Sequence, residues 1–289
     1  MASGRAFWLS SGYSMPAVGL GTWQSKNDEV RDAVKIALEA GYRHIDAAAV
    51  YGNEKQVGDG IKASGVPRED IFIHWPVSFR YSNETIQPID AKTGLIDVID
   101  VPIKDTWAAM ERLVEQGKVR TIGVSNFTRE KIEELFKTAK IRPAVNQIEA
   151  HPYLQQRDLL QWSKDNQIVI TGYSPLGNNI YNIPRAVDDN LVIDIARKLG
   201  KTPAQVLISW AVQRGTVVLP KSVTAERIRS NFEDFVLPED AFEAVQSLEK
   251  HKRMNFPARL GVDIFGEVGE ASAQQSAQDW AEEQKKIGK

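Results

Sequence analysis

Two side chains that could take part in proton transfer lie close together near the start of the chain. Asp46 lies inside the short apolar stretch Arg43–Ala48, and Tyr51 follows directly before Gly52. A carboxylate in an apolar strand is costly unless a cation or a hydrogen-bond donor meets it there. A tyrosine at the exit of a strand lies where α/β folds carry their chemistry. The structural alternative is a buried aspartate that holds a turn beside an ordinary tyrosine.

A histidine that could polarise a reacting group also follows an apolar strand-like run. Residues 71–73 are apolar, and His74 leads from them into Trp75 and Pro76. The chain has no cysteine and four histidines, and no two histidines have the close spacing of a zinc motif. We therefore expect chemistry without a metal.

Composition narrows the class of protein further. The 289 residues are 42% hydrophobic and 26% charged, with a net charge of −2 and no basic block, which argues against nucleic acid as a partner. No segment approaches the length of apolar residues that spans a membrane, and residues 1–20 lack the apolar run of a signal peptide. We expect a cytoplasmic protein.

Strands and helices alternate along most of the chain. Strand starts at 119, 144 and 168 have the spacing of successive β/α units, which indicates a parallel sheet. Polar residues gather where strands end, as on the active face of a barrel. Residues 19–23 contain Gly-x-Gly without a third glycine, so a dinucleotide fingerprint fails. The expected strands are 18–21, 43–48, 71–74, 119–124, 144–148, 168–173 and 216–219. The expected helices are 28–40, 54–64, 103–117, 129–139, 156–165, 191–199, 203–213, 225–233 and 239–250, with a charged helix near the end.

Seven short motifs, each at a strand exit, together resemble the aldo-keto reductase family. They are Gly19-Leu-Gly-Thr-Trp23, Asp46-x-Ala-x-x-Tyr51-Gly-Asn-Glu54, Ile73-His-Trp-Pro76, Gly123-Val-Ser-Asn-Phe127, Asn146-Gln147, Tyr173-Ser-Pro-Leu176 and Pro220-Lys-Ser-Val-Thr-x-x-Arg227-Ile-x-x-Asn231. The tail and the loop 178–184 look most like fungal aldehyde and glycerol-type NADP-dependent reductases. The resemblance implies a single-domain TIM (β/α)8-type barrel over 1–289. It would have an N-terminal β-hairpin at 7–17 and a substrate loop and tail at about 251–289.

The resemblance also implies a reaction and a set of reacting residues. The family transfers hydride reversibly between NADPH and an aldehyde or ketone, and we expect a monomer that takes a small carbonyl substrate. Tyr51 would protonate the carbonyl oxygen, with Asp46 as its catalytic neighbour, and His74 would orient and polarise that oxygen. Trp23, Trp75 and Phe79 would form an apolar wall beside Tyr51 and His74, although aromatic residues at such places can simply be core.

The same resemblance assigns the NADP site. Tyr173 matches the tyrosine that stacks on the nicotinamide, and Ser125, Asn126 and Gln147 match the residues that hold its carboxamide. Lys221, Ser222, Arg227 and Asn231 match the clamp on the adenosine phosphate, although an arginine such as Arg227 can also be a solvated helix charge. The whole implied set is Thr22, Trp23, Asp46, Ser125, Asn126, Gln147, Tyr173, Ser174, Leu176, Lys221, Ser222, Arg227 and Asn231.

The chain departs from the family between Tyr51 and His74. Only 23 residues separate them, so one strand, one helix and the family's catalytic lysine are missing. Lys55 and Lys62 lie in the interval, but on the expected helix and not at a strand end. We therefore expect a barrel that lacks one β/α unit, with a defect between the strands at 43–48 and 71–75. Two functions remain open: an NADP-dependent carbonyl reductase, with a reductase dedicated to one pathway as a variant, and an impaired or non-catalytic NADP(H)-binding barrel.

Overall fold

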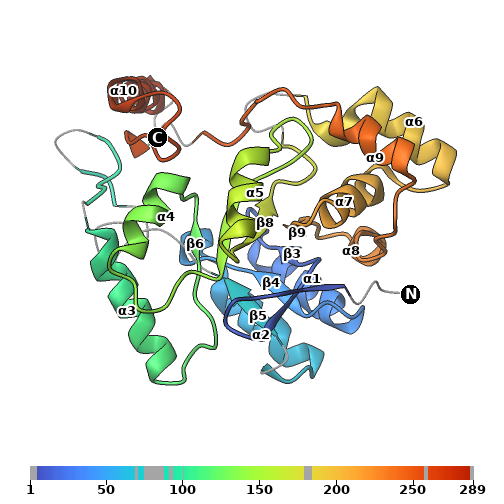
Figure 1. Ribbon diagram of the computed structural model, residues 1–289, viewed down its shortest axis with the longest axis horizontal. Helices are drawn as coiled ribbons and strands as arrows, with labels where there is room; N and C mark the ends of the chain where they lie inside the picture. Colours follow the sequence, from blue (N-terminus) through green and yellow to red (C-terminus); the bar gives the residue numbers. More distant parts are fainter. Residues whose placement is uncertain are drawn as a thin grey trace. The chain divides into compact units, whose positions relative to one another are not determined.

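The computed structural model describes residues 5–68, 71–74, 88–90, 94–99, 101–178, 184–256 and 260–286 (Figure 1). These residues group into two compact units. Unit 1 comprises Met1–Trp75, Arg120–Ser125 and Pro143–Met254, and unit 2 comprises Pro76–Val119, Asn126–Arg142 and Asn255–Lys289. The predicted wall residues Trp75 and Phe79 lie outside the described residues, and the segment Phe72–His74 is described by its backbone.

Unit 1 contains parallel strands that form one continuous series. The strands are β3 (Leu20–Gly21), β4 (His44–Asp46), β5 (Phe72–His74), β6 (Val124–Ser125), β7 (Val145–Glu149), β8 (Val169–Tyr173) and β9 (Val217–Val218). They form the sheets β3-β4-β5 and β6-β7-β8-β9, and all neighbours within them are parallel. Parallel bridges from Val18 to Val218 and from Gly21 to Lys221 join the two sheets. The resulting order is β5-β4-β3-β9-β8-β7-β6.

This series of strands is strongly curved. Neighbouring strands lie about 4.8 Å apart, so β4 and β7 would be roughly 19 Å apart in a flat sheet. Yet Gln147 on β7 donates a hydrogen bond to Asp46 on β4 at 3.0 Å. Side chains this short can meet only if the sheet bends around them. The strand order and the curvature are those of an α/β barrel, as predicted.

In the described part of the chain the series ends at β5 on one side and at β6 on the other, which is not where the sequence suggested a defect. We expected a defect between the strands at 43–48 and 71–75, but β4 and β5 pair in regular parallel register, from His44↔Phe72 to Asp46↔His74. Within the part of the chain that the structure describes, β5 pairs only with β4, and β6 pairs only with β7. The prediction of the defect's position was therefore wrong. The short connection after Tyr51 brings β5 directly against β4, so the outer strands of the described series are β5 and β6.

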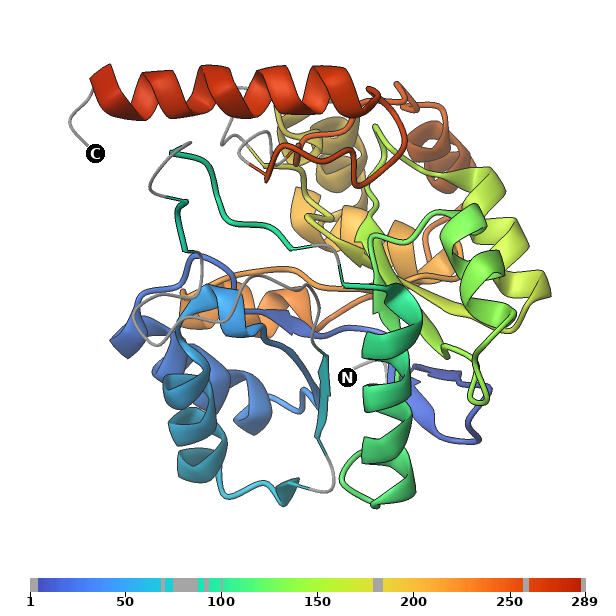
Figure 2. The same cartoon turned by 90° about the vertical axis from the view of Figure 1, so that its left-hand side faces the viewer.

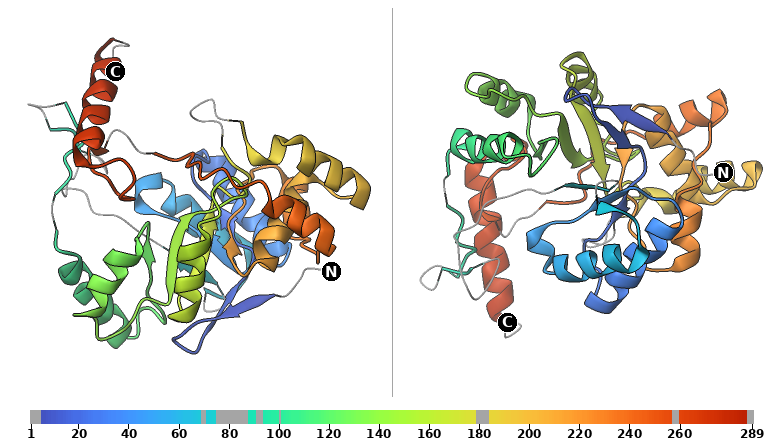
Figure 3. Two further views of the ribbon diagram at one scale, coloured as in Figure 1. Left: turned by 45° about the horizontal axis from the view of Figure 1, so that its top comes forward. Right: turned by 90° about the horizontal axis from the view of Figure 1, so that it is seen from below.

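A β-hairpin covers the amino ends of the strands in unit 1, as predicted. Its strands β1 (Ala6–Trp8) and β2 (Ser14–Pro16) are antiparallel. Leu9 and Met15 pack with Ala144, Val145 and Val217, which lie at the starts of their strands. The dark blue hairpin is visible beside these strands in Figure 3.

The helices of unit 1 follow their sequence signals closely. They are α1 (Asn27–Glu39), α2 (Glu54–Ser64), α5 (Arg157–Asp165), α6 (Asn190–Leu199), α7 (Pro203–Gln213), α8 (Ala225–Asn231) and α9 (Glu239–Gln246), with short 3-10 turns at Ala49–Tyr51 and Ala186–Asp188. Thr202 and Gln205 form a capping box, which with Pro203 explains where α7 begins. Gly65 ends α2 in a left-handed conformation.

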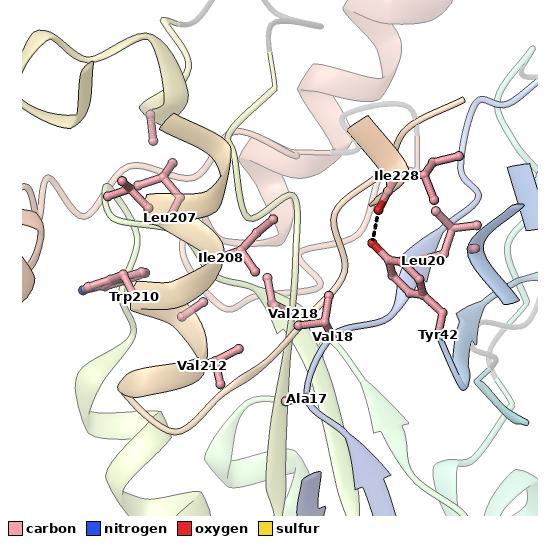
Figure 4. Packing of buried hydrophobic residues seen from close by; sticks show 14 of the residues in the cluster. Ala17, Val18, Leu20, Tyr42, Leu207, Ile208, Trp210, Val212, Val218 and Ile228 are labelled. Atoms are coloured by element: carbon pink, nitrogen blue, oxygen red, sulfur yellow. Dashed lines mark hydrogen bonds between the residues drawn. The ribbon is translucent and has the colours of Figure 1, made fainter. Parts of the chain in front are cut away.

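Close packing of these helices forms the main core. α1 and α2 lie side by side (Figure 2), because Gly60 has no side chain where a Cβ would come within 2.5 Å of the Arg31 carbonyl oxygen. Figure 4 shows Val18 and Val218, on the bridged strands, packed against Ile208 of α7. Helix α7 is apolar almost all round, which fits its burial.

Unit 2 is mainly helical, with α3 (Ile103–Glu115), α4 (Arg129–Phe136) and α10 (Glu270–Lys286). Buried Glu111 on α3 accepts hydrogen bonds from the backbone of Lys140 and Ile141, and Trp107 donates to the Ile141 carbonyl at 2.9 Å. These contacts fix the chain that follows α4. Across the described residues of both units, no helix combines the length and apolarity needed to cross a membrane.

Candidate active site

The Asp46 carboxylate is the buried centre of the candidate site. It lies at the carboxyl end of β4 with 5% of its surface exposed. Gln147 donates to Oδ1 at 3.0 Å, and the Tyr51 hydroxyl lies 3.4 Å from Oδ2. Burial raises the pKa of Asp46 to about 6, and the hydrogen bonds from Gln147 and Tyr51 partly offset that rise. Among the described residues, no lysine or arginine forms an ion pair with this carboxylate.

Tyr51 lies in the 3-10 turn Ala49–Tyr51, directly after β4. Burial raises the pKa of its hydroxyl, and the neighbouring Asp46 charge raises it further, with a smaller effect from Tyr173. Burial is the larger of these causes. At neutral pH the phenol therefore carries its proton and can donate it.

Backbone contacts hold the neighbours of Asp46 in place. Buried Thr22, which directly follows β3, donates from its hydroxyl to the Asp46 carbonyl at 2.7 Å. Ser125, at the end of β6, donates to the Gln147 carbonyl at 3.0 Å. Of the predicted site residues, the structure thus connects Thr22, Asp46, Tyr51, Ser125 and Gln147 in a single hydrogen-bonded group.

Asn53 has a role that the sequence did not reveal. Asn53 occupies the N-cap position of α2, a position that asparagine often caps, but its side chain makes no capping hydrogen bond. Its amide instead donates to the carbonyls of Thr22 and Ser25 at 3.0 and 3.3 Å. Asn53 therefore ties the loop after β3, with Thr22 and Trp23, to the turn that carries Tyr51. Trp23 itself is 38% exposed.

Two predicted cofactor residues have an unusual backbone. Ser174 and Asn126 both adopt left-handed φ angles, 50° and 58°. Such conformations are costly for residues other than glycine and gather at functional sites. Ser174 follows Tyr173 at the end of β8, and Leu176 packs against the main core two residues further on. Asn126 follows Ser125 in the chain but belongs to unit 2.

The predicted phosphate clamp lies on β9's exit and on α8. Lys221 and Arg227 are exposed, and neither forms an ion pair within the described part of the chain. Ser222 and Asn231 are buried, and Ser222 accepts a hydrogen bond from the Thr224 amide at 3.1 Å. The backbone of Lys221 bridges to Gly21, immediately before Thr22. The clamp is thereby connected to the exit of β3.

Of the predicted reacting residues, His74 is located by its backbone. It ends β5, and its register partner on β4 is Asp46. The two lysines between Tyr51 and His74 do not take the place of the family's catalytic lysine. Lys55 has an 81% exposed side chain and pairs with Asp59 on α2 at 2.8 Å. Lys62 is exposed in the last turn of that helix. Neither is at a strand end. Among the described residues there is also no cluster of three or more histidine, aspartate or glutamate side chains that could hold a metal ion.

A second buried carboxylate, Glu149, was missed by sequence reasoning. It ends β7, two residues after Gln147, and lies 2.9 Å from His151 Nε2. The Arg253 guanidinium lies 3.6 Å from its other oxygen. The only available signal was an acidic residue at a strand exit followed by a histidine, and nothing in the sequence pointed to Arg253 as its partner.

A curved parallel sheet with reactive side chains at the carboxyl ends of its strands defines an α/β-barrel protein with its candidate site on the usual face. Residues 17–95 and 73–250 match the model of the aldo/keto reductase family. The chain belongs to this family, which confirms the predicted fold class and the resemblance.

Individual relatives agree with this assignment. An aldehyde reductase of Saccharomyces cerevisiae, YPR1, is 41% identical over 84% of this chain and 90% of its own. A glycerol 2-dehydrogenase (NADP(+)) of the same yeast is 38% identical, over 84% of this chain and 90% of its own. The structure of an aldose reductase from Schistosoma japonicum superposes with a TM-score of 0.80 at 33% identity, covering 89% of this chain and 96% of that one.

Proposed function

We propose that this protein is an NADP-dependent oxidoreductase that reduces an aldehyde or ketone to an alcohol. The observation that carries the proposal is the contact of Tyr51 with Asp46, beside Gln147, on the face where this family carries its chemistry. The proton donor and the implied cofactor residues are thus adjacent. We extend the proposal to a monomeric, cytoplasmic, single-domain enzyme for a small carbonyl substrate.

The donor set fits NADP. Lys221 and Arg227 present two exposed cations that suit a phosphate group, and Arg227 offers a planar fork. Ser125 and Gln147 would hold the nicotinamide carboxamide, together with Asn126, and Tyr173 would stack on the ring. Ser222 and Asn231 would complete the phosphate end. Thr22, Trp23, Ser174 and Leu176 are proposed to line the same cofactor site.

In the proposed reaction the protein positions the carbonyl group and supplies the proton. The bound nicotinamide supplies the hydride. Tyr51 donates its hydroxyl proton to the carbonyl oxygen, which prevents an unfavourable alkoxide from accumulating. His74 would hold the same oxygen by a hydrogen bond, and Trp23 and Trp75 would shape an apolar substrate wall. Regenerating Tyr51 requires a proton from solvent.

A specific observation also supports the second candidate, a catalytically impaired or non-catalytic NADP(H)-binding barrel. The raised pKa of Tyr51 makes it a weak acid, and Asp46 adds a negative charge beside it with no cationic partner among the described residues. Two comparisons agree with a missing β/α unit near His74. The family match divides into two segments that overlap at 73–95, and the alignment to a D/L-glyceraldehyde reductase of Hypocrea jecorina runs over 328 residues, more than the 289 of this chain.

The two candidates are separated by measuring binding and turnover on the same protein. NADPH binding is followed by quenching of tryptophan fluorescence, and NADPH consumption with an aromatic aldehyde by absorbance. The enzyme proposal predicts binding and a slow turnover that Tyr51→Phe abolishes, whereas Tyr13→Phe, on the exposed hairpin, leaves it unchanged. Binding without any Tyr51-dependent turnover would favour the non-catalytic candidate, and absence of binding would contradict both.

A further inference from the structure

Glu149 is a fully buried carboxylate, and two of its partners, Arg253 and Met254, come from a distant part of the chain. Its exposed surface is 0%. Oε1 accepts a hydrogen bond from the Met254 amide at 2.6 Å and faces His151 Nε2 at 2.9 Å, while Oε2 faces the Arg253 guanidinium. Hydrogen bonds to an ionised group in a buried site are stronger than neutral ones. Glu149 thus holds the backbone at residues 253–254 against the exit of β7.

Further contacts fix the segment that leads to Met254. We call residues 249–254 the tail anchor. Lys250 and Lys252 both donate from their backbone amides to the Tyr153 carbonyl, at 3.2 and 2.9 Å, and the Lys250 ammonium lies 3.5 Å from the centre of the Tyr153 ring. Glu249 accepts a hydrogen bond from the Gln155 amide at 2.9 Å. Tyr153 and Gln155 of the loop after β7 are therefore joined to residues 249–252 of the tail anchor.

Met254 in turn contacts the loop after β8 and helps to hold it in place. Its side chain is buried, and Sδ accepts the backbone amide hydrogen of Asn178 at 3.4 Å. A Cβ on Gly177 would lie 2.8 Å from the Ala186 nitrogen, 3.0 Å from the Arg185 Cα and 3.1 Å from the same sulfur, so the loop packs closely against both residues 185–186 and Met254. Residues 173–178 thus rest on a side chain whose own backbone is held by Glu149.

The loop in question is the one proposed to carry the cofactor-stacking tyrosine. Tyr173 begins it, and Glu149 is the register partner of Tyr173 across β7 and β8. The Ala150 amide also donates to the Tyr173 carbonyl at 3.3 Å. Glu149 is thus close to two proposed cofactor residues. Gln147 lies two residues before it on β7, and Tyr173 lies beside it on β8.

We propose that Glu149 is a positioning residue: by holding Met254 it fixes the 173–178 loop, and with it Tyr173, for cofactor binding. The part of this proposal that concerns the cofactor rests on the proposed NADP-dependent function. The structural part, that Glu149 acts on Asn178 through Met254, stands independently.

The test compares Glu149→Gln with Glu249→Gln by amide hydrogen exchange and NADPH titration. Glu249 is the matched control, a carboxylate of the tail anchor that accepts hydrogen bonds from the backbone amides of Gln155, Lys250 and His251. In Glu149→Gln, exchange at Met254 and at Asn178 should accelerate about fivefold or more, as expected for the loss of a charge-assisted hydrogen bond. The Kd for NADPH should rise by a similar factor. Glu249→Gln should leave the Asn178 amide and the Kd unchanged.

Faster exchange at Met254 without any change at Asn178 would overturn the proposal, as would equal effects of the two variants. Should Glu149→Gln fail to fold, Met254→Leu keeps an apolar side chain of similar volume and removes only the sulfur acceptor. That variant should accelerate exchange at Asn178 and weaken NADPH binding. An unchanged Asn178 amide in Met254→Leu contradicts the proposal. If the unmutated protein does not bind NADPH, the proposed function fails, while the exchange measurement still decides whether Glu149 positions the loop.

Discussion

Gln147 on β7 donates a hydrogen bond from Nε2 to Oδ1 of Asp46 on β4 at 3.0 Å, across the interior of the curved sheet. Three strands lie between β4 and β7 in the sheet order. This contact gives the buried Asp46 carboxylate its best hydrogen-bond donor among the described residues. It also joins the implied carboxamide-binding residue to the carboxylate beside Tyr51.

Replacing Gln147 with leucine should destabilise the protein in a pH-dependent way. At about pH 7 the buried Asp46 carboxylate would lose its donor, at a cost of about 1–3 kcal/mol in the free energy of unfolding. At about pH 5 the loss should be smaller, because the pKa of Asp46 is about 6 and the carboxyl group already carries a proton. Urea denaturation at both pH values measures this. Gln155→Leu is the control. Gln155 donates to the carbonyls of Pro152 and Gln246, which do not titrate, so the stability lost in this variant should not depend on pH. A loss for Gln147→Leu that is equal at the two pH values would contradict the account.

Replacing Asp46 with asparagine should stabilise the protein most at neutral pH. Burial raises the pKa of Asp46 from 3.8 to about 6 in the folded protein, so the folded state binds the proton more tightly than the unfolded state. Asp46 therefore lowers stability progressively as pH rises from about 4 to about 6. Asparagine does not titrate, so the difference in unfolding free energy between Asp46→Asn and the unmutated protein should grow through this window to about 2–3 kcal/mol. A difference that stays constant with pH would show that folding does not raise the pKa of Asp46.

Arg227 should determine the preference for NADPH over NADH. Arg227→Ala should weaken NADPH binding by about 1–3 kcal/mol, as for a charge-assisted contact, and should leave NADH binding nearly unchanged. Arg229 is an exposed arginine of the same helix, and Arg229→Ala is the matched control for the loss of general positive charge. Fluorescence titration of the three proteins with both cofactors measures the six affinities. Equal affinity of the unmutated protein for NADPH and NADH would rule out the assignment of the clamp.

The sequence predicted the elements well where local signals were strong. The predicted helices at 54–64 and 203–213 match α2 and α7, because Gly65 and the capping box of Thr202 mark their limits. The strand predicted over 119–124 was too long, since only Val124–Ser125 forms a ladder with β7. Before it, a single backbone hydrogen bond joins Ala144 to the Ile122 carbonyl. Apolar residues alone do not specify where pairing starts.

The family motifs pointed to Asp46, Tyr51 and Gln147 as candidate site residues, but they did not predict the contacts between them. The hydrogen bond from Gln147 to Asp46 joins residues 101 positions apart and depends on the curvature of the whole sheet. Likewise, the Asn53 amide donates to the carbonyls of Thr22 and Ser25, which lie about 30 positions away, instead of capping its own helix. The position of β5 at the edge of the described series followed from how β5 pairs, which local patterns do not encode.

The central claim is that Tyr51 is the proton donor of a reductase whose missing β/α unit leaves it poorly tuned. The most direct test measures turnover of NADPH with a reactive aromatic aldehyde, in this protein and in a version with one family β/α unit and its strand-end lysine inserted between Tyr51 and His74. A cation beside Asp46 should lower the pKa of Tyr51 and so make its hydroxyl a stronger proton donor to the carbonyl oxygen. We predict that the restored version turns over about 10²–10⁴-fold faster, the range that proton-transfer catalysis supplies. Comparable turnover in the two proteins would contradict the account.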